Sequence, residues 1–173
     1  MRNVKNIISS DAKRYEGSKL PKFQKYFRLC SNSGGIKKIV YRILYKRYRE
    51  KMGIEIPYTC DIGLGLYIGH PYGITINPKV KIGNNCNIHK GVTIGQENRG
   101  KRQGTPIIGN EVWIGVNATI VGKISIGDDV LIAPNTFVNR DIPSHSICFG
   151  NPCQIKSCVH ATKNYINNRC DIE

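Results

Sequence analysis

An aliphatic residue returns at every sixth position from Ile62 to Val138, apart from two slips, and this period restricts the fold more than any other feature. The register returns at Ile82, Ile88, Ile94, Ile108, Ile114, Ile120, Ile126, Ile132 and Val138. A six-residue period fits neither an amphipathic helix, which repeats about every 3.6 residues, nor a strand that alternates every two. It is typical of a parallel β-helix, in which three short faces close one triangular coil. Residues one coil apart then stack at roughly 4.8 Å, so the aliphatic positions form one internal column.

The period slips twice, and each slip predicts residues that leave the column. Between Ile68 and Ile76 there are two extra positions, in a stretch that contains His70. Between Ile94 and Ile108 the insertion is eight residues long, and residues 96–106 are polar, basic and rich in glycine. This composition predicts a protruding loop. Insertions in solenoids map to outer faces that often bind ligands, so both slips indicate a site.

The chain is expected to divide into three parts. Residues 1–52 predict a basic helical segment, with one helix beginning near Pro21 and another lying between Ser33 and Gly53. The second helix has one apolar face, formed by Ile36, Ile39, Val40, Ile43 and Leu44. A tyrosine stripe beside it is expected to pack on the β-helix or on a neighbouring subunit: Tyr41, Tyr45 and Tyr48. Residues 53–153 form the β-helix with loop 96–106. Residues 154–173 form a carboxy-terminal tail without a predicted structure.

The net charge of +14 is concentrated in the amino-terminal segment. Residues 1–52 hold 15 Lys and Arg against 3 acids, whereas residues 53–153 hold 8 against 7. The basic segment can contact an anionic membrane surface or polymer, or it can be a solvated helical face, and the sequence leaves both open. It offers no aromatic platforms, so nucleic acid is not an expected partner. The start lacks an apolar run for a signal peptide or span, which predicts a cytoplasmic protein with peripheral membrane contact left open.

The seven cysteines and four histidines predict neither a disulfide framework nor a metal site. The cysteines form no CxxC pair and are odd in number, so they are expected to be reduced and mostly buried. A metal enzyme on this fold needs three converging histidines, but only His70 and His89 lie within the regular coils.

The repeat, His70 and the basic loop together resemble the hexapeptide-repeat acyltransferases. The similarity is closer to the serine acetyltransferase branch and to its relatives that O-acetylate capsule or lipopolysaccharide sugars. It covers roughly residues 54–156 and rests on five strings, at 54–57, 62–70, 91–95, 112–115 and 150–152. The resemblance implies a mainly β, left-handed parallel β-helix that assembles as a homotrimer. It also implies that acetyl-CoA binds as a co-substrate in the groove between subunits.

Matched to the family's motifs, His70 falls on the general base that removes a proton from the acceptor hydroxyl. An imidazole, with an unperturbed pKa of roughly 6.5, suits this proton exchange at neutral pH. Glu55 falls on the carboxylate that orients this histidine. The resemblance places CoA binding on six residues: Gly115, Val116, Pro134, Asn139, Arg140 and Lys156. Trp113 either lines the groove or packs, and His89, which has no catalytic counterpart, is expected at the surface or at an interface.

The sequence departs from serine acetyltransferases at two positions. Gly69 replaces an aspartate, and Thr105 replaces a second active-site histidine. Both losses remove groups that hold free serine, so a hydroxyl on a sugar, capsule or lipopolysaccharide precursor is the expected acceptor. Lys101, Arg102 and Thr105 are expected to shape its site. The alternatives are a serine O-acetyltransferase of cysteine biosynthesis and a non-catalytic structural solenoid.

Overall fold

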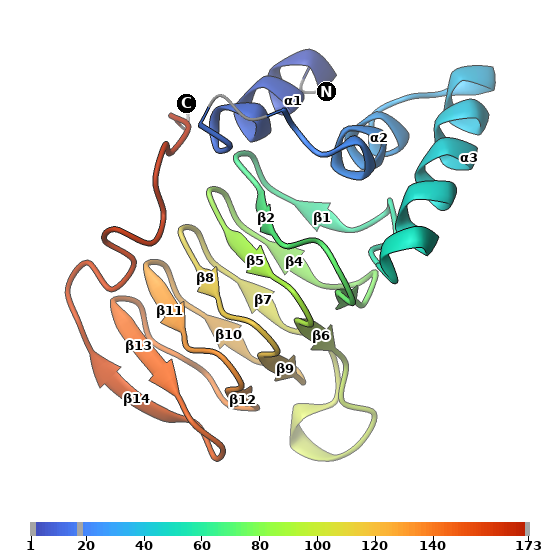
Figure 1. Cartoon of the computed structure of the whole chain (residues 1–173). Helices are drawn as coiled ribbons and strands as arrows, with labels where there is room; N and C mark the ends of the chain where they lie inside the picture. The colour runs from blue at the N-terminus through green and yellow to red at the C-terminus, as the bar shows by residue number, and fades with distance from the viewer. Residues whose placement is uncertain (1–2, 17–18, 172–173) are drawn as a thin grey trace.

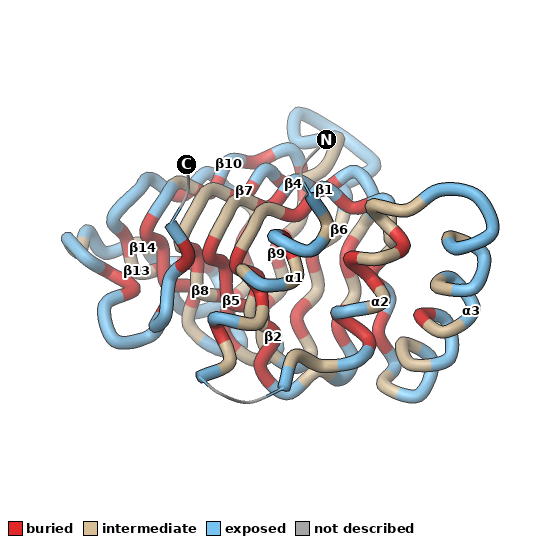
Figure 2. Tube along the Cα trace, turned by 90° about the horizontal axis from the view of Figure 1, so that it is seen from above, coloured by how far each residue is buried: buried red, intermediate tan, exposed pale blue. Residues whose placement is uncertain are grey.

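The computed structural model describes residues 3–16 and 19–171. Three helices come first in the chain: α1 (Val4–Lys13), α2 (Lys22–Ser31) and α3 (Gly35–Met52). Figure 1 shows that they gather at one end of a stack of coils built from short strands. Figure 2 shows the buried positions following the inner side of those coils.

The strands form three sheets, one for each face of the coil. Sheet 1 contains β1 (Asp61–Ile62), β4 (Lys81–Ile82), β7 (Ile107–Ile108) and β10 (Ser125–Ile126). Sheet 2 contains β2 (Tyr67–Gly69), β5 (Asn87–His89), β8 (Trp113–Ile114), β11 (Val130–Ile132), β13 (Ser146–Phe149) and β14 (Gln154–Ser157). Sheet 3 contains β3 (Thr75–Ile76), β6 (Thr93–Gly95), β9 (Thr119–Val121) and β12 (Phe137–Val138). The prediction of a mainly β, left-handed parallel β-helix with a helical amino-terminal segment is confirmed.

The six-residue aliphatic column is the core of this fold. In sheet 2, Ile68 pairs with Ile88, Ile88 with Ile114, and Ile114 with Ile132. All four are buried. Because stacked side chains of one kind fill the same space in every coil, the period alone specifies the packing.

The strand register places both insertions outside this column. Ile62 pairs with Ile82 in spite of the two extra residues near His70, and Ile82 pairs with Ile108 in spite of the eight-residue insertion. The loop after β6 contains the short 3-10 helix η1 (Gly100–Arg102). Its ends are joined by two backbone hydrogen bonds between Glu97 and Gly104, of 2.9 and 3.0 Å.

The column continues beyond the point where its sequence pattern ends. Ile142 bridges to Ile126 in sheet 1, and Cys148 pairs with Ile132 in sheet 2. The chain then reverses, and β14 pairs antiparallel with β13. A single strand that runs against the others therefore covers the carboxy-terminal edge of sheet 2.

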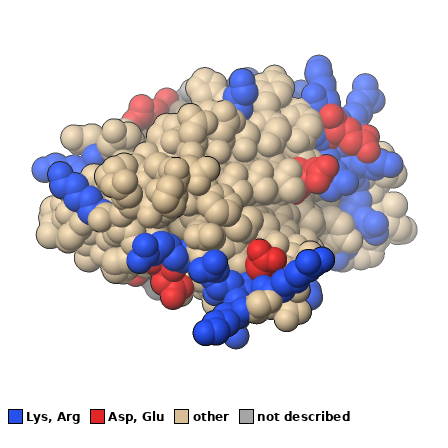
Figure 3. Space-filling model, turned by 90° about the horizontal axis from the view of Figure 1, so that it is seen from below, with Lys and Arg blue, Asp and Glu red and all other residues tan. Residues whose placement is uncertain are grey.

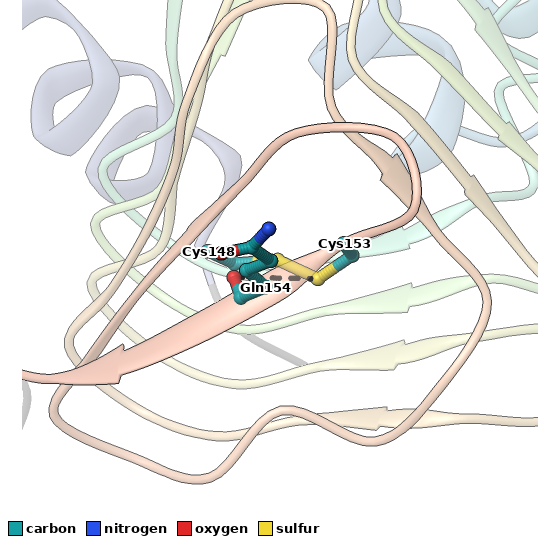
Figure 4. Close-up of a disulfide and its surroundings, with 3 residues drawn as sticks. All are labelled: Cys148, Cys153 and Gln154. Carbon is teal, nitrogen blue, oxygen red and sulfur yellow. Dashed lines mark hydrogen bonds between the residues drawn. A yellow bond between two sulfur atoms is a disulfide. The ribbon is translucent and has the colours of Figure 1, made fainter.

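This reversal also overturns the expectation that all cysteines are reduced. Cys148 and Cys153 form a disulfide across the β13–β14 turn, with their Cα atoms 6.2 Å apart (Figure 4). No CxxC motif signals this pair, because the turn itself, and not a short motif, brings the two residues together. The other five cysteines are free, and four of these are buried: Cys30, Cys60, Cys86 and Cys170.

Helices α1 and α2 cover the first coil with buried polar side chains. Arg28 donates two hydrogen bonds to the carboxylate of Asp11, at 2.8 and 3.0 Å, and two more to the carbonyl oxygens of Ile62 and Gly63. Asp11 in turn accepts a hydrogen bond from the backbone N–H of Leu66. Backbone groups of the first coil have no preceding coil to pair with, so these side chains satisfy them. Part of the basic charge of residues 1–52 is therefore structural.

Helix α3 packs through its tyrosine stripe, as expected, and not through the aliphatic row beside it. Its tyrosine stripe lies against the core, and the hydroxyl of buried Tyr45 donates to the carbonyl oxygen of Ile56. The aliphatic row is exposed instead: Ile36, Ile39, Val40 and Ile43. The helix ends as predicted at Gly53, which adopts the left-handed conformation with φ of 59°.

The tail after β14 is held on sheet 2, although its sequence predicted no structure. Asp129 accepts hydrogen bonds from the backbone N–H groups of Ala161 and Thr162, at 3.0 and 2.9 Å, and from the Thr162 hydroxyl. Asn85 exchanges two hydrogen bonds with the backbone of Cys170. These polar anchors replace an apolar pattern, which explains why a hydrophobic-period argument misses the tail.

Candidate active site

His70 lies on the edge of the β-helix between sheets 2 and 3. It follows β2 directly and adopts a left-handed backbone conformation with φ of 53°. Its side chain is exposed, and its carbonyl oxygen accepts a hydrogen bond from the N–H of Tyr72. The two extra residues of the first slip therefore form a short turn that displays the imidazole outside the core.

Glu55 lies at the start of sheet 3, close to the turn that carries His70. Its backbone pairs with β3: its N–H donates to the Ile74 carbonyl at 2.7 Å, and its carbonyl accepts from Ile76 at 2.9 Å. This register sets Glu55 beside Thr75, five residues after His70. Both side chains are exposed, and among the described residues no hydrogen bond or ion pair links them.

Three of the six predicted CoA residues share the edge of His70. Backbone hydrogen bonds connect this edge from coil to coil: Lys90 N–H to Gly69, Asn117 N–H to Lys90, and Asn135 N–H to Val116. Gly115, Val116 and Pro134 therefore follow His70 along one line. A Cβ on Gly115 would lie 2.6 Å from the nitrogen of Pro134, so the close stacking of these coils requires glycine there.

The other three predicted CoA residues lie elsewhere. Asn139 and Arg140 follow β12 on the edge between sheets 3 and 1, and Lys156 lies in β14 opposite Ile147. Within one chain the two cations do not meet the His70 edge.

The predicted acceptor residues lie on the far side of sheet 3 from His70. Lys101 and Arg102 belong to η1 of the loop after β6, and both are exposed. Thr105 follows the loop, and its hydroxyl donates to the Lys79 carbonyl at 3.3 Å. The loop joins sheet 3 to sheet 1, whereas His70 joins sheet 2 to sheet 3. One chain therefore does not bring the loop residues to His70.

His89, expected only at the surface or at an interface, lies directly against the site. It pairs with Gly69 across β2 and β5, and a Cβ on Gly69 would come within 2.6 Å of the His89 ring. Its Nδ1 lies 2.8 Å from the Ile114 carbonyl. Burial lowers the pKa of His89, and the hydrogen bond to Ile114 only partly offsets this. The twenty-residue offset between the first two coils is the signal that could have placed His89 beside Gly69.

The described residues, 3–16 and 19–171, contain neither a cluster of metal ligands nor a membrane-spanning helix. No three His, Cys, Asp or Glu side chains gather there as metal ligands. None of the helices in these residues is both long and apolar enough to cross a membrane.

Comparisons with known proteins agree on a family. Residues 105–140 match the family described as bacterial transferase hexapeptide (six repeats). A serine acetyltransferase of Helicobacter pylori is 38% identical over 112 residues, which cover 65% of this chain and 66% of that protein. Serine acetyltransferase 2 of Arabidopsis thaliana is 35% identical over 119 residues, which cover 69% of this chain and 37% of the relative. The chain thus spans less than two thirds of these curated relatives.

Solved structures agree with these relatives. A serine acetyltransferase of Neisseria gonorrhoeae in complex with serine superposes with a TM-score of 0.69 and 26% identity, over 89% of this chain and 69% of that one. A serine acetyltransferase in complex with CoA gives a TM-score of 0.62 and 25% identity, over 78% of this chain and 54% of that one. With the coil register and the repeat in agreement, the chain belongs to the hexapeptide-repeat transferase family, and within it the chain is similar to serine acetyltransferases.

Proposed function

We propose that this chain transfers an acetyl group from acetyl-CoA to a hydroxyl group, with His70 as general base. The observation that carries the proposal is the arrangement of one edge, where exposed His70 is in line with Gly115, Val116 and Pro134. An acyl donor that extends along this edge would present its thioester beside the imidazole. The relatives are serine acetyltransferases, and one solved relative is a complex with CoA.

In the proposed reaction, His70 takes the hydroxyl proton while the hydroxyl oxygen attacks the thioester carbonyl carbon. The carbon–sulfur bond then breaks, and the imidazolium returns the proton to the departing thiolate of CoA. Glu55 would act as a positioning residue, because a carboxylate near an imidazole favours one orientation and stabilises the imidazolium. Its backbone bridge to Thr75, five residues after His70, supports this assignment.

L-serine is the acceptor that the comparisons favour. The curated relatives bear the name serine acetyltransferase, and the Neisseria structure is a serine complex. They support serine better than the sugar hydroxyl expected from the sequence.

A sugar hydroxyl remains a second candidate because of two positions in this chain. Gly69 and Thr105 carry neither the carboxylate nor the imidazole that serine acetyltransferases have there. A site that loses a specific polar contact can lose discrimination of about 10⁴-fold or more.

A thiol-release assay with acetyl-CoA distinguishes these acceptors. The purified chain is incubated with L-serine or with a panel of neutral and acidic sugars, and acetylated products are identified by mass spectrometry. Serine-dependent thiol release, lost in His70→Ala, is the expected result. Turnover of sugars alone would replace serine with the second candidate, and no turnover of any hydroxyl compound would contradict the proposed activity.

A further inference from the structure

A cavity of about 430 Å³ lies where the end of α1, sheet 2 and the carboxy-terminal tail meet. Several aromatic rings are among the residues that line it, although most of the surface that the lining exposes is polar. The ring centroids of Tyr15 and Tyr67 lie 4.8 Å apart, those of His89 and Trp113 lie 4.6 Å apart, and those of Trp113 and Tyr165 lie 5.1 Å apart. Three segments that are distant in the sequence therefore build one pocket.

The one cationic side chain among the described residues that line this pocket, Arg14, already donates its hydrogen bonds to other parts of the protein. Arg14 is 4% exposed, and its guanidinium donates to the carbonyls of Asn167 and Gly65 and to the side-chain oxygen of Asn87. The amide of Asn87 donates to the Tyr165 carbonyl. A ligand that carries a phosphate would need a free cation, and the described lining residues offer none. The pocket thus disfavours a ligand that carries a phosphate or another anionic group.

Two hydrogen-bond acceptors that line the pocket, on His89 and Glu16, suit the hydroxyl groups of a ligand. Because Nδ1 of His89 faces a carbonyl oxygen, this nitrogen must carry the proton, and Nε2 is then an acceptor. Burial lowers the pKa of His89, which keeps the ring neutral at pH 7. The carboxylate of Glu16 also lines the pocket and adds a second acceptor.

We propose that this pocket binds a neutral sugar ring, with aromatic faces against its C–H surface and with His89 Nε2 accepting from one hydroxyl. Binding sites for small molecules commonly combine aromatic walls with a few polar groups that fix orientation. The His89 ring also lies on Gly69, the residue before His70, so a saccharide here would adjoin the proposed catalytic edge. The inference deepens the second acceptor candidate and rests on the proposed function only for what the bound sugar does next.

Binding can be measured without acetyl-CoA, which separates this inference from the proposed activity. The probes are methyl α-D-glucopyranoside, methyl β-D-galactopyranoside and N-acetyl-D-glucosamine, with adenosine and L-serine for comparison. Ligand-observed NMR gives the affinity, and Trp113, the single tryptophan of the chain, reports occupancy by fluorescence. At least one sugar is expected to bind and to change the Trp113 emission.

Two variants locate the bound sugar. Tyr165→Ala removes an exposed wall and should weaken binding roughly three- to tenfold, the value of one aromatic contact. His89→Phe keeps a ring but removes Nε2, and it should weaken binding by a similar factor. Val159→Ala, an exposed change in the same tail, is the matched control and should leave the affinity unchanged.

Three results would overturn the inference. The first is that none of the sugars binds. The second is that adenosine binds and the sugars do not. The third is that sugars bind with the same affinity to the wild type and to Tyr165→Ala. If the wild-type chain binds a sugar but does not acetylate serine, this result would instead contradict only the proposal that serine is the acceptor.

Discussion

His70 differs from the other residues on its edge of the β-helix. Where this edge turns, the left-handed backbone is occupied by Gly73, Gly91, Asn117 and Asn135, the residue types that adopt it most easily. His70 is left-handed as well, but it is a β-unbranched aromatic residue in an extra turn that those corners lack. A histidine in a position that the fold does not require indicates a chemical role.

Replacing His70 with alanine should reduce acetyl transfer by about 10²- to 10⁴-fold, the usual contribution of general acid–base catalysis. The side chain is exposed, so the unfolding midpoint and the affinity for acetyl-CoA should stay close to those of the wild type. Glu55→Gln should cost less, because it disturbs the orientation of the base without removing it. Steady-state kinetics measure both variants, and His160→Ala, an exposed histidine of the tail, is the control. A loss below tenfold in His70→Ala would make this histidine structural.

Gly69 and His89 form a matched pair, which gives a steric reason why the family aspartate is missing here. A Cβ on Gly69 would lie 2.6 Å from Cδ2 and 2.9 Å from Nε2 of His89. Gly69→Ala should therefore destabilise the protein by about 1–3 kcal/mol through overpacking. Adding His89→Ala should recover part of that loss. Urea unfolding of both single variants and the double variant measures the coupling; strictly additive changes would show that the ring does not exclude the side chain.

At the scale of elements, α2 covers the first coil through one buried ion pair. Arg28 and Asp11 are 3% and 0% exposed. Arg28→Ala would leave the buried carboxylate of Asp11 without its cationic partner, so it should destabilise the chain by about 3–5 kcal/mol. Lys25→Ala, on the exposed side of the same helix, should change stability by less than about 0.5 kcal/mol. Chemical denaturation compares them, and equal effects would contradict the capping role.

The tail depends on the charge of Asp129. Burial alone would raise the pKa of this carboxyl group, but hydrogen bonds from Thr162, His145 and the Ala161 backbone outweigh it and lower the pKa to about 2. Because the folded pKa lies below the unfolded value, the tail anchor is complete above about pH 4 and is lost as the pH falls toward 2. Asp129→Asn should reproduce this loss at neutral pH.

Hydrogen exchange at the Ala161 and Thr162 amides measures the anchor, since both donate to this carboxylate. Exchange should accelerate in Asp129→Asn and should be unchanged in Asp128→Asn. Tail amides that remain equally protected in both variants would show that the anchor does not depend on this charge.

At the scale of the whole molecule, the separation of His70 from the loop favours an assembly. The two lie on opposite edges of sheet 3, whose outward row is formed by Thr75, Thr93, Thr119 and Phe137. Figure 3, the view from below, shows a broad face with few charged side chains, bordered by Lys and Arg. Copies that pack side by side through this face would bring the loop of one chain to His70 of the next.

We therefore expect a homotrimer with sites shared between chains. Sedimentation equilibrium should give three times the chain mass of 19.4 kDa. Co-expression of His70→Ala with a loop variant, Lys101→Ala/Arg102→Ala, should give more activity than either variant shows alone. In the mixed trimers, some interfaces join an intact His70 from one chain to an intact loop from the next. A stable monomer in the presence of CoA, or a mixture no more active than its parts, would count against shared sites.

The sequence predicts those features of the fold that depend on a local repeat, and it predicts less well those that depend on contacts between residues distant in the sequence. The aliphatic column is a local period, so the register from Ile62 to Val138 could be predicted residue by residue, and the insertions with it. The docking of α3 through Tyr41, Tyr45 and Tyr48 could be predicted as well, because these residues repeat at helical spacing. The exposure of the isoleucine row could not, because it repeats at the same spacing and only the tertiary contacts leave it uncovered.

The candidate site is predictable to a similar extent. His70 stands out because the period slips there, and its likeness to the family motif agrees. The neighbours of His70 were missed where they depend on coil-to-coil pairing or on polar anchors: His89 meets Gly69 across two strands, and Tyr165 reaches Trp113 through a tail held by Asp129. The second contact has no sequence period, whereas the first follows from the twenty-residue offset between the first two coils.

The covers at the two ends of the stack also affect how the protein can associate with copies of itself. A parallel β-helix is a ladder that could in principle add another molecule at either end, as a fibril does. Here the side chains of Arg14 and Arg28 occupy backbone acceptors at one end, and antiparallel β14 covers the edge of sheet 2 at the other. These contacts reduce the number of free backbone groups at the two ends, so removal of either cover would expose more of the template on which a second copy could pair.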